Sequence, residues 1–246
     1  MKKFGLIGYP LSHSFSKGYF SDKFLKEGIT DSVYDNYEIE EINLIEEIIS
    51  NESAIRGLNV TIPYKQDVIP FLDALHPAAE RIGAVNVIAI DKQKKLTGYN
   101  SDYFGFKASL ESLLAGDVKL SALVLGTGGA SKAVVAALED LGIYYQMVSR
   151  TSSSTSLCYE DITEELIQEH RLIVNTTPLG MTPKVQTLPK LPYSAIGEQH
   201  YLYDLVYNPE ITRFLQEGID RGAKVKNGLE MLHLQAEKAW EIWNEA

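Results

Sequence analysis

The chain has 246 residues, which is enough for one large domain or two modest ones, and its 45% hydrophobic and 23% charged content is typical of a globular protein. A formal net charge of -10 argues against nucleic acid or an acidic membrane as a partner, because either requires a basic face. We find no run of 18 apolar residues and no cleavable leader, so we expect a cytoplasmic protein. The single cysteine, Cys158, fits a reducing compartment, and we expect no metal site.

The first hundred residues read as strands alternating with helices. Apolar runs predict strands at 4–7, 33–37, 56–60 and 87–90, with a further strand after the charged hairpin tip at 91–98. Helical spacing of apolar residues predicts helices at about 16–27, through Ile42, Ile45, Ile48 and Ile49, at about 67–75, and through Phe106, Leu110, Leu113 and Leu114.

Hydroxyl side chains alternate after the first strand, at Ser12, Ser14 and Ser16. One of them is explained as a helix cap, since a serine at a helix start accepts a bond from the next turn. Two or three together form a natural donor set for a small carboxylate, which is the interpretation we favour. His13 in the same run has no metal-ligand spacing around it.

Further polar residues fall at predicted strand ends, where open α/β sheets bind ligands. Pro63 closes one strand within NVTIPYK, so that Asn59, Thr61 and Lys65 project from its terminus. Asn86, Asn100 and Asp102 occupy later strand ends. Lys65 alone reads as a solvated lysine and Asp102 alone as a helix cap, but their coincidence with the amides favours a site.

The stretch from Ala122 to Thr151 predicts a dinucleotide site. A short apolar strand at 122–125 is followed by Gly126, Gly128 and Gly129, then by a helix from about Ser131 that Gly142 ends. Such glycines allow close approach of a pyrophosphate to the backbone and to the positive end of the helix dipole.

The end of the next strand indicates which dinucleotide is bound. No Asp or Glu occurs from Leu141 to Tyr159 to bind a ribose hydroxyl, and Arg150 stands at the expected position instead. A guanidinium suits the extra phosphate of NADP because it offers several fixed donors to a dianion. The alternative is that Arg150 is a solvated surface residue.

The remainder completes an α/β pattern. We expect a loop at 152–163, strands at 171–175, 201–205 and 223–226, a proline-rich surface loop at 181–192, and a helix opened by YNPEIT. The last helix carries Leu229, Leu232, Ala236, Trp240 and Trp243 on one side, so it must dock on another element.

Together these motifs resemble the shikimate dehydrogenase family nearly from end to end. The matching segments are the SHSxS run at 12–16, NVTIPYK at 59–65, GAVN at 83–86, NSD at 100–102, LGTGGASKA at 125–133, SRT at 149–151, NTTPLGM at 175–181, YDLVYNP at 203–209, and NGLEML with Gln235. The resemblance implies an N-terminal α/β substrate domain (1–101 plus 229–246) that takes back the C-terminal helix. It also implies a doubly wound, Rossmann-like NADP domain (102–228) and the reduction of 3-dehydroshikimate to shikimate in aromatic amino acid biosynthesis.

The resemblance also implies roles for individual residues. Lys65 and Asp102 would be the catalytic pair. The substrate carboxylate would be bound by Ser14, Ser16 and Tyr207, and the ring hydroxyls by Asn59, Thr61, Asn86, Asp102 and Gln235. NADP would be bound by Gly126, Thr127, Gly128, Gly129, Ala130, Ser149, Arg150, Thr151, Thr176, Leu205 and Gly228.

Some positions depart from the family pattern. The family usually has asparagine at Ser149 and a second basic residue a few positions after Arg150, where this chain has Ser152–Ser154. Without this second cation, the preference for NADP over NAD depends on Arg150. The alternatives are an enzyme that also oxidises quinate, a methylene-tetrahydrofolate dehydrogenase, in which the serine run and Asp102 would have no purpose, and a non-catalytic sensor of shikimate or NADP. The expected partner is a small anionic substrate, and the protein is expected to be a monomer or a homodimer.

Overall fold

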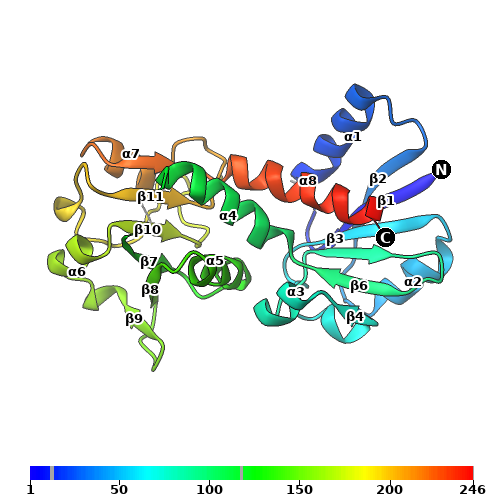
Figure 1. Cartoon of the computed structure of the whole chain (residues 1–246), viewed down its shortest axis with the longest axis horizontal. Helices are drawn as coiled ribbons and strands as arrows, with labels where there is room; N and C mark the ends of the chain where they lie inside the picture. Colours follow the sequence, from blue (N-terminus) through cyan, green and yellow to red (C-terminus); the bar gives the residue numbers. More distant parts are fainter. Residues whose placement is uncertain (12–13, 117–118, 246) are drawn as a thin grey trace. The chain divides into compact units, whose positions relative to one another are not determined.

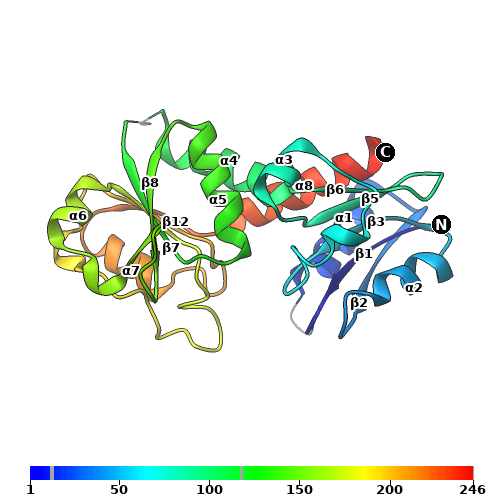
Figure 2. The same cartoon turned by 90° about the horizontal axis from the view of Figure 1, so that it is seen from below.

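The computed structural model describes residues 1–11, 14–116 and 119–245. Its contacts divide it into two compact units, Met1–Ser101 with Ala236–Ala246, and Asp102–Gln235. Each unit contains one six-stranded sheet with helices packed on it, and the elements can be followed in Figures 1 and 2. The predicted α/β class is therefore confirmed, whereas which ligand each unit binds stays a prediction.

The first unit is built on a mixed sheet with the strand order β2-β1-β3-β5-β6-β4. Strand β1 pairs in parallel with β2 and β3, while β5 pairs antiparallel with β3 and β6. In chain order its elements are β1 (Lys2–Gly8), α1 (Phe15–Glu27), β2 (Ser32–Glu38), α2 (Leu44–Asn51), β3 (Ile55–Val60), the 3-10 turn η1 (Ile69–Phe71), β4 (Ala74–Leu75), α3 (Pro77–Ile82), β5 (Val87–Ile90) and β6 (Leu96–Tyr99).

Alternate residues of these strands face two separate cores. Phe4, Leu6, Val87 and Ala89 pack with Phe20 and Phe24 of α1, whereas Ile7, Leu58 and Ile88 pack with Ile45 of α2 and Ala79 of α3. Because both faces of the sheet are covered, polar groups of this unit reach solvent mainly at the strand ends.

The C-terminal half of α8 (Leu229–Glu245) docks on the first unit beside α1. Trp243 stacks on Phe4 with ring centroids 4.9 Å apart and donates from its indole to the Ile88 carbonyl over 3.0 Å. Gly57 makes room for this ring, since a Cβ at that position would lie 2.1 Å from Trp243 Cδ1.

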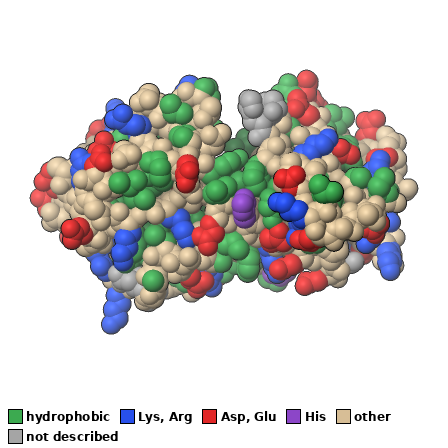
Figure 3. Space-filling model, turned by 90° about the horizontal axis from the view of Figure 1, so that it is seen from above, with side chains coloured by type: hydrophobic (Ala, Val, Ile, Leu, Met, Phe, Trp, Pro, Cys, Tyr) green, Lys and Arg blue, Asp and Glu red, His purple; other side chains and the backbone are tan. Residues whose placement is uncertain are grey.

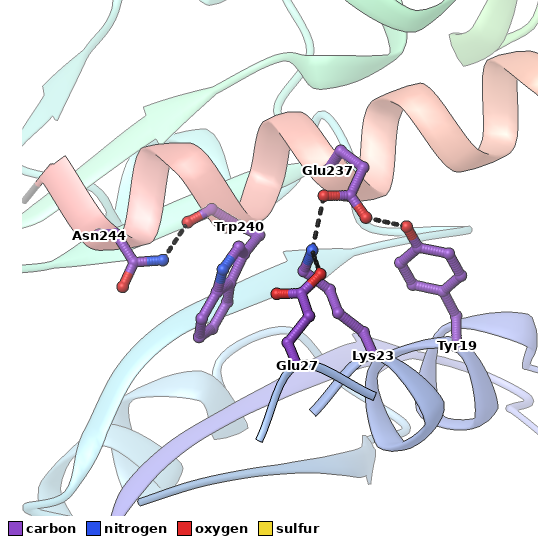
Figure 4. A network of polar contacts seen from close by, with 6 residues as sticks. All are labelled: Tyr19, Lys23, Glu27, Glu237, Trp240 and Asn244. Atoms are coloured by element: carbon purple, nitrogen blue, oxygen red, sulfur yellow. Dashed lines mark hydrogen bonds and ion pairs between the residues drawn. The ribbon is translucent and has the colours of Figure 1, made fainter. Parts of the chain in front are cut away.

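Polar contacts join the same two helices (Figure 4). Glu237 of α8 accepts a hydrogen bond from the Tyr19 hydroxyl and another from Lys23 Nζ over 2.7 Å, while Lys23 also pairs with Glu27 at 2.7 Å. The last helix therefore docks on the first unit as expected, although its buried residues are Met231, Ala236, Ala239, Ile242 and Trp243, and Leu229 is 40% exposed.

The predicted helix at 67–75 is wrong. The segment forms only the 3-10 turn η1, which contains Pro70, and then β4, which pairs with β6 through Ala74 and Thr97. Pairing with the sheet edge outweighs the local helical pattern here, and the proline limits the helix to its first turn.

The second unit contains a wholly parallel sheet with the strand order β12-β11-β10-β7-β8-β9. In chain order its elements are α4 (Ser101–Leu114), β7 (Ser121–Leu125), α5 (Gly129–Asp140), β8 (Tyr144–Ser149), β9 (Ser156–Cys158), the 3-10 turn η2 (Tyr159–Asp161), α6 (Glu164–Glu169), β10 (Leu172–Asn175), the 3-10 turn η3 (Tyr193–Ala195), β11 (Tyr201–Asp204), α7 (Arg213–Ile219), β12 (Lys224–Lys226) and the first part of α8.

The chain runs outward from β7 to β9 and then returns to β10, so the strand order reverses between β7 and β10. Helices cover both faces of the sheet: Ala122 and Val124 pack with α4 and α5, and Leu123 and Leu125 pack in the core that includes α6 and α7. In doubly wound sheets of this kind a dinucleotide binds beyond the carboxyl ends of the strands at the reversal point.

The expected loop at 152–163 is wrong in part, because it contains β9 and η2. Strand β9 is a three-residue edge strand that pairs Ser156 with Met147 of β8, which is too short for an apolar pattern to reveal. Helices α3 and α6, of six residues each, were not predicted for the same reason.

Acidic and basic side chains are interspersed on the face drawn in Figure 3. Within the described residues no helix is both long and apolar enough to cross a bilayer. Nor do those residues include a group of three or more His, Cys, Asp or Glu side chains suited to hold a metal ion.

Candidate active site

Ser14 lies at the entrance of α1 and is not used as a helix cap. It occupies the N-cap position with extended backbone, but its side chain makes no capping bond. Its Oγ is buried and finds no hydrogen-bond partner among the described residues. A buried hydroxyl without a partner costs about 1–3 kcal/mol, so it is better explained as a group that meets a ligand than as a cap. Ser12 and His13 lie outside the described residues.

Two buried amides join the ends of β3 and β5. Asn59 donates from Nδ2 to the Asn86 carbonyl over 3.2 Å, and the backbone N–H of Val60 donates to the same oxygen over 2.9 Å. Asn86 in turn donates from Nδ2 to Ser101 Oγ over 3.0 Å and accepts at Oδ1 from the Ser101 N–H over 2.7 Å. Both amides are less than a tenth exposed, so their positions are fixed before any ligand binds.

The same contacts fix the start of α4, where Asp102 lies. Asp102 is in the first helical turn and only 9% exposed. The positive end of a helix dipole stabilises an acidic side chain in that turn. Because Asn86 bonds to both donor and acceptor groups of Ser101, the residue preceding Asp102 is held at the start of β5.

Lys65 lies in the loop after β3, which closes on the segment before β5. Its carbonyl accepts from the Val85 N–H over 2.7 Å, and Thr61 donates its N–H to the Ile7 carbonyl over 2.9 Å. These bonds bring Asn59, Thr61, Lys65 and Asn86 together where β3 ends and β5 begins. The ammonium-bearing side chain of Lys65 is half-buried there.

Gln235 and Tyr207 belong to the second unit. A Cβ at Gly105 of α4 would lie 2.6 Å from the Met231 carbonyl oxygen and 3.0 Å from the Gln235 nitrogen, so α4 and α8 pack backbone to backbone beside Gln235. Gln235 also donates from Nε2 to the Leu232 carbonyl over 2.9 Å. The Tyr207 hydroxyl is half-buried, and burial raises its pKa.

The glycine turn after β7 has the geometry of a phosphate site. Gly126 has φ +107°, and a Cβ there would lie 2.8 Å from Thr176 Oγ1, so only glycine fits between β7 and the loop after β10. A Cβ on Gly128 or Gly129 would meet nothing within 4 Å, and Gly128 caps the twelve-residue helix α5 without a side-chain bond. Open space in front of unpaired helix N–H groups suits a pyrophosphate.

Three loops converge beyond the carboxyl ends of β7, β10 and β11. Thr176 donates from its N–H and its Oγ1 to the Leu125 carbonyl over 2.9 and 2.8 Å. The Leu205 N–H donates to the Asn175 carbonyl over 3.0 Å. A Cβ on Gly228 would lie 2.1 Å from the Leu205 oxygen, so a glycine is required there as well.

Arg150, which the sequence predicts to distinguish NADP from NAD, lies at the carboxyl end of β8. Ser149 Oγ bonds to the Thr151 carbonyl and lies 3.3 Å from Ser156 Oγ, which shapes the turn around Arg150. Arg150 is exposed, and its guanidinium makes no hydrogen bond or ion pair with the residues that the structure describes. In the described part of the chain, the Arg150 guanidinium and the hydroxyls of Ser149 and Ser156 therefore lie together at the predicted position of the ribose phosphate.

Comparison with known proteins agrees with this arrangement. The family model described as the shikimate dehydrogenase substrate binding domain matches residues 6–88. The NADP(+) shikimate dehydrogenase of Clostridium beijerinckii is 42% identical over 100% of this chain and 93% of its own length. The chain belongs to the shikimate dehydrogenase family.

Solved structures of other family members extend the match to three dimensions. A shikimate 5-dehydrogenase from Thermus thermophilus, in complex with NADP(H) and shikimate, is 34% identical with a TM-score of 0.85, covering 100% of this chain and 94% of that one. A quinate dehydrogenase from Corynebacterium glutamicum, in complex with NAD, is 27% identical with a TM-score of 0.88 at the same coverage.

Two residues important for the geometry of the candidate site and its neighbouring loops are assigned no role by the sequence. Asp204 is fully buried at the end of β11, where Oδ1 accepts from Asn175 Nδ2 and the Val206 N–H and Oδ2 accepts from Thr212 Oγ1. Burial raises the pKa of its carboxyl from 3.8 to about 6. The second is Tyr34, whose buried hydroxyl contacts Asn59. The sequence does not reveal what either side chain bonds to, because the partners of a polar group buried in a strand depend on the register of the neighbouring strands.

Proposed function

We propose that this shikimate dehydrogenase reduces 3-dehydroshikimate to shikimate with NADPH, reversibly, and that Lys65 and Asp102 are its catalytic pair. The observation that carries the proposal is the polar edge of the first unit. It combines a buried Ser14 hydroxyl, which has no partner among the described residues, with two prepositioned amides, a lysine and the start of the helix that bears Asp102. These hydroxyl, amide and ammonium groups are suited to bind a small polyhydroxy carboxylate.

The cofactor unit fits NADP. The unobstructed glycines at 128 and 129 leave space for the pyrophosphate, and the available guanidinium of Arg150 suits the ribose phosphate. When bound, NADPH supplies the hydride. Thr176, Leu205 and Gly228 border the position where the nicotinamide would lie.

Reduction of a ketone leaves negative charge on its oxygen, so a donor must supply a proton as the C–H bond forms. The Lys65 ammonium donates this proton, and in the oxidation direction the Lys65 amine accepts the proton of the alcohol. Asp102 orients Lys65 and accepts a hydrogen bond from the neighbouring hydroxyl. Ser14, Ser16 and Tyr207 hold the substrate carboxylate, and Asn59, Thr61, Asn86 and Gln235 hold the ring hydroxyls.

Two alternatives remain to be distinguished by experiment. Quinate differs from shikimate in its ring, and a family member named for quinate has the same fold. A non-catalytic sensor would have no need of Lys65 and Asp102, and both are present.

A spectrophotometric assay of nicotinamide reduction tests the proposal, with shikimate and quinate each offered NADP+ and NAD+. We expect the highest kcat/KM with shikimate and NADP+. A preference for quinate would support the first alternative, and binding without turnover would support the second.

A further inference from the structure

The hydroxyl of Tyr34 contacts Asn59, which is assigned to the substrate, and has no role of its own in the proposal above. Tyr34 lies on β2 and is 4% exposed. Its hydroxyl donates to Asn59 Oδ1 over 2.8 Å.

These contacts determine which way the Asn59 amide faces. Asn59 Nδ2 points to the Asn86 carbonyl, which can only accept, so Oδ1 must face the phenol. With Oδ1 bonded to Tyr34 and one Nδ2 proton bonded to Asn86, the second Nδ2 proton is left for a ligand. Asn59 therefore acts toward a substrate hydroxyl as a donor.

The surroundings of Tyr34 keep the phenol protonated and in place. Its ring stacks on Phe20 with centroids 4.5 Å apart and planes 14° apart, and Trp243 lies 6.3 Å away. Burial raises the pKa of the hydroxyl above its ordinary range, so it is protonated and a donor at neutral pH. A phenylalanine at this position keeps the ring contacts and removes only the donor.

We propose that Tyr34 is a positioning residue of the substrate site, which fixes the Asn59 amide as a donor toward the ring hydroxyls. The inference rests on the proposed function, because it takes Asn59 as a substrate-binding group. Tyr34 acts through Asn59 and does not touch the reacting atoms.

Tyr34→Phe leaves Asn59 Oδ1 without its donor, so that the amide is held by the Asn86 carbonyl alone and is less firmly positioned. We expect the KM for shikimate to rise about 3- to 10-fold, the range of one neutral hydrogen bond. The KM for NADP+ and kcat remain unchanged, since neither depends on the orientation of this amide.

A double-mutant cycle tests the inference, with wild type, Tyr34→Phe, Asn59→Ala and the double variant assayed for shikimate and NADP+. We expect the double variant to have the shikimate KM of Asn59→Ala alone, because Tyr34 has no amide left to orient. An additive loss, or a wild-type shikimate KM for Tyr34→Phe, would overturn the inference. Shikimate oxidation by the wild type, measured alongside, separates this failure from failure of the proposed function.

Tyr203→Phe is the matched control. Its hydroxyl is also buried and donates to Ser109 Oγ over 2.9 Å, but it lies in the core of the second unit. We expect this variant to lose similar thermal stability and to keep the wild-type shikimate KM. If Tyr34→Phe is too unstable for turnover assays, equilibrium titration with shikimate at low temperature, followed by the fluorescence of Trp240 and Trp243, gives the same comparison.

Discussion

Arg150 makes the choice of cofactor testable by one substitution. Arg150→Gln removes the exposed guanidinium at the end of β8 and leaves the Ser149 and Ser156 hydroxyls in place. A hydrogen bond to a charged group contributes about 1.5–3 kcal/mol, which corresponds to roughly a 10- to 100-fold rise in the KM for NADP(H). Because Arg150 is exposed and no second cation follows it, we expect a value toward the lower end.

The dependence on salt provides a second measure of the same interaction. An exposed charge is screened strongly at high ionic strength, so the preference of the wild type for NADP+ over NAD+ should decline from low to high salt, and the variant should show little decline. The assay is kcat/KM for each cofactor, at saturating shikimate and at two salt concentrations.

Arg221→Gln is the charge-matched control. Arg221 follows α7 and pairs with Glu217 at 2.7 Å. Its replacement by glutamine removes one positive charge, as Arg150→Gln does. We expect it to leave both cofactor constants unchanged. Equal losses for NADP(H) and NAD(H) in Arg150→Gln, or equal losses of NADP(H) binding in the two variants, would refute the assignment of Arg150 to the ribose phosphate.

Two further predictions concern stability. Burial raises the pKa of Asp204 from 3.8 to about 6, so between these values the native state holds a proton that the unfolded chain releases. The protonated carboxyl therefore contributes about 3 kcal/mol to the free energy of unfolding below pH 4. This contribution is lost as the pH rises through 6. Urea denaturation of wild type and Asp204→Asn across this range should show the decline in the wild type only, and parallel curves would contradict it. Glu237→Gln removes the charge shared by Lys23 and Tyr19 and should lower the free energy of unfolding by about 1 kcal/mol. Glu241→Gln, which breaks the more exposed pair with Lys238, should cost less, and the reverse ranking would argue against α8 docking through this network.

The long elements and the glycine turn can be predicted from the sequence because their signals are local. The apolar run at 122–125 and the glycines after it reveal a buried strand and a tight turn within a few residues. The same local reading fails at Pro70, where pairing of β4 with β6 overrides a helical pattern, and at Ser156, where an edge strand of three residues is too short to show a period.

The sequence predicts which residue types form the candidate site, but it does not predict which hydrogen bonds they make. Ser14 is open to interpretation as a cap, and only the structure separates its N-cap position from its unused hydroxyl. The roles of Tyr34 and Asp204 depend on the pairing of strands from different parts of the chain. A sequence pattern therefore does not reveal which amide or loop each one holds.

The central claim is that the Lys65 amine transfers the proton that accompanies the hydride. The most direct measurement is kcat of Lys65→Ala for shikimate and NADP+, with the KM for NADP+ and the thermal unfolding of the variant measured on the same preparation. We predict a fall in kcat of about 10²- to 10⁴-fold, the usual effect of losing a general acid or base, with the fold and cofactor affinity retained. Turnover at the wild-type rate in a folded Lys65→Ala protein would contradict the account.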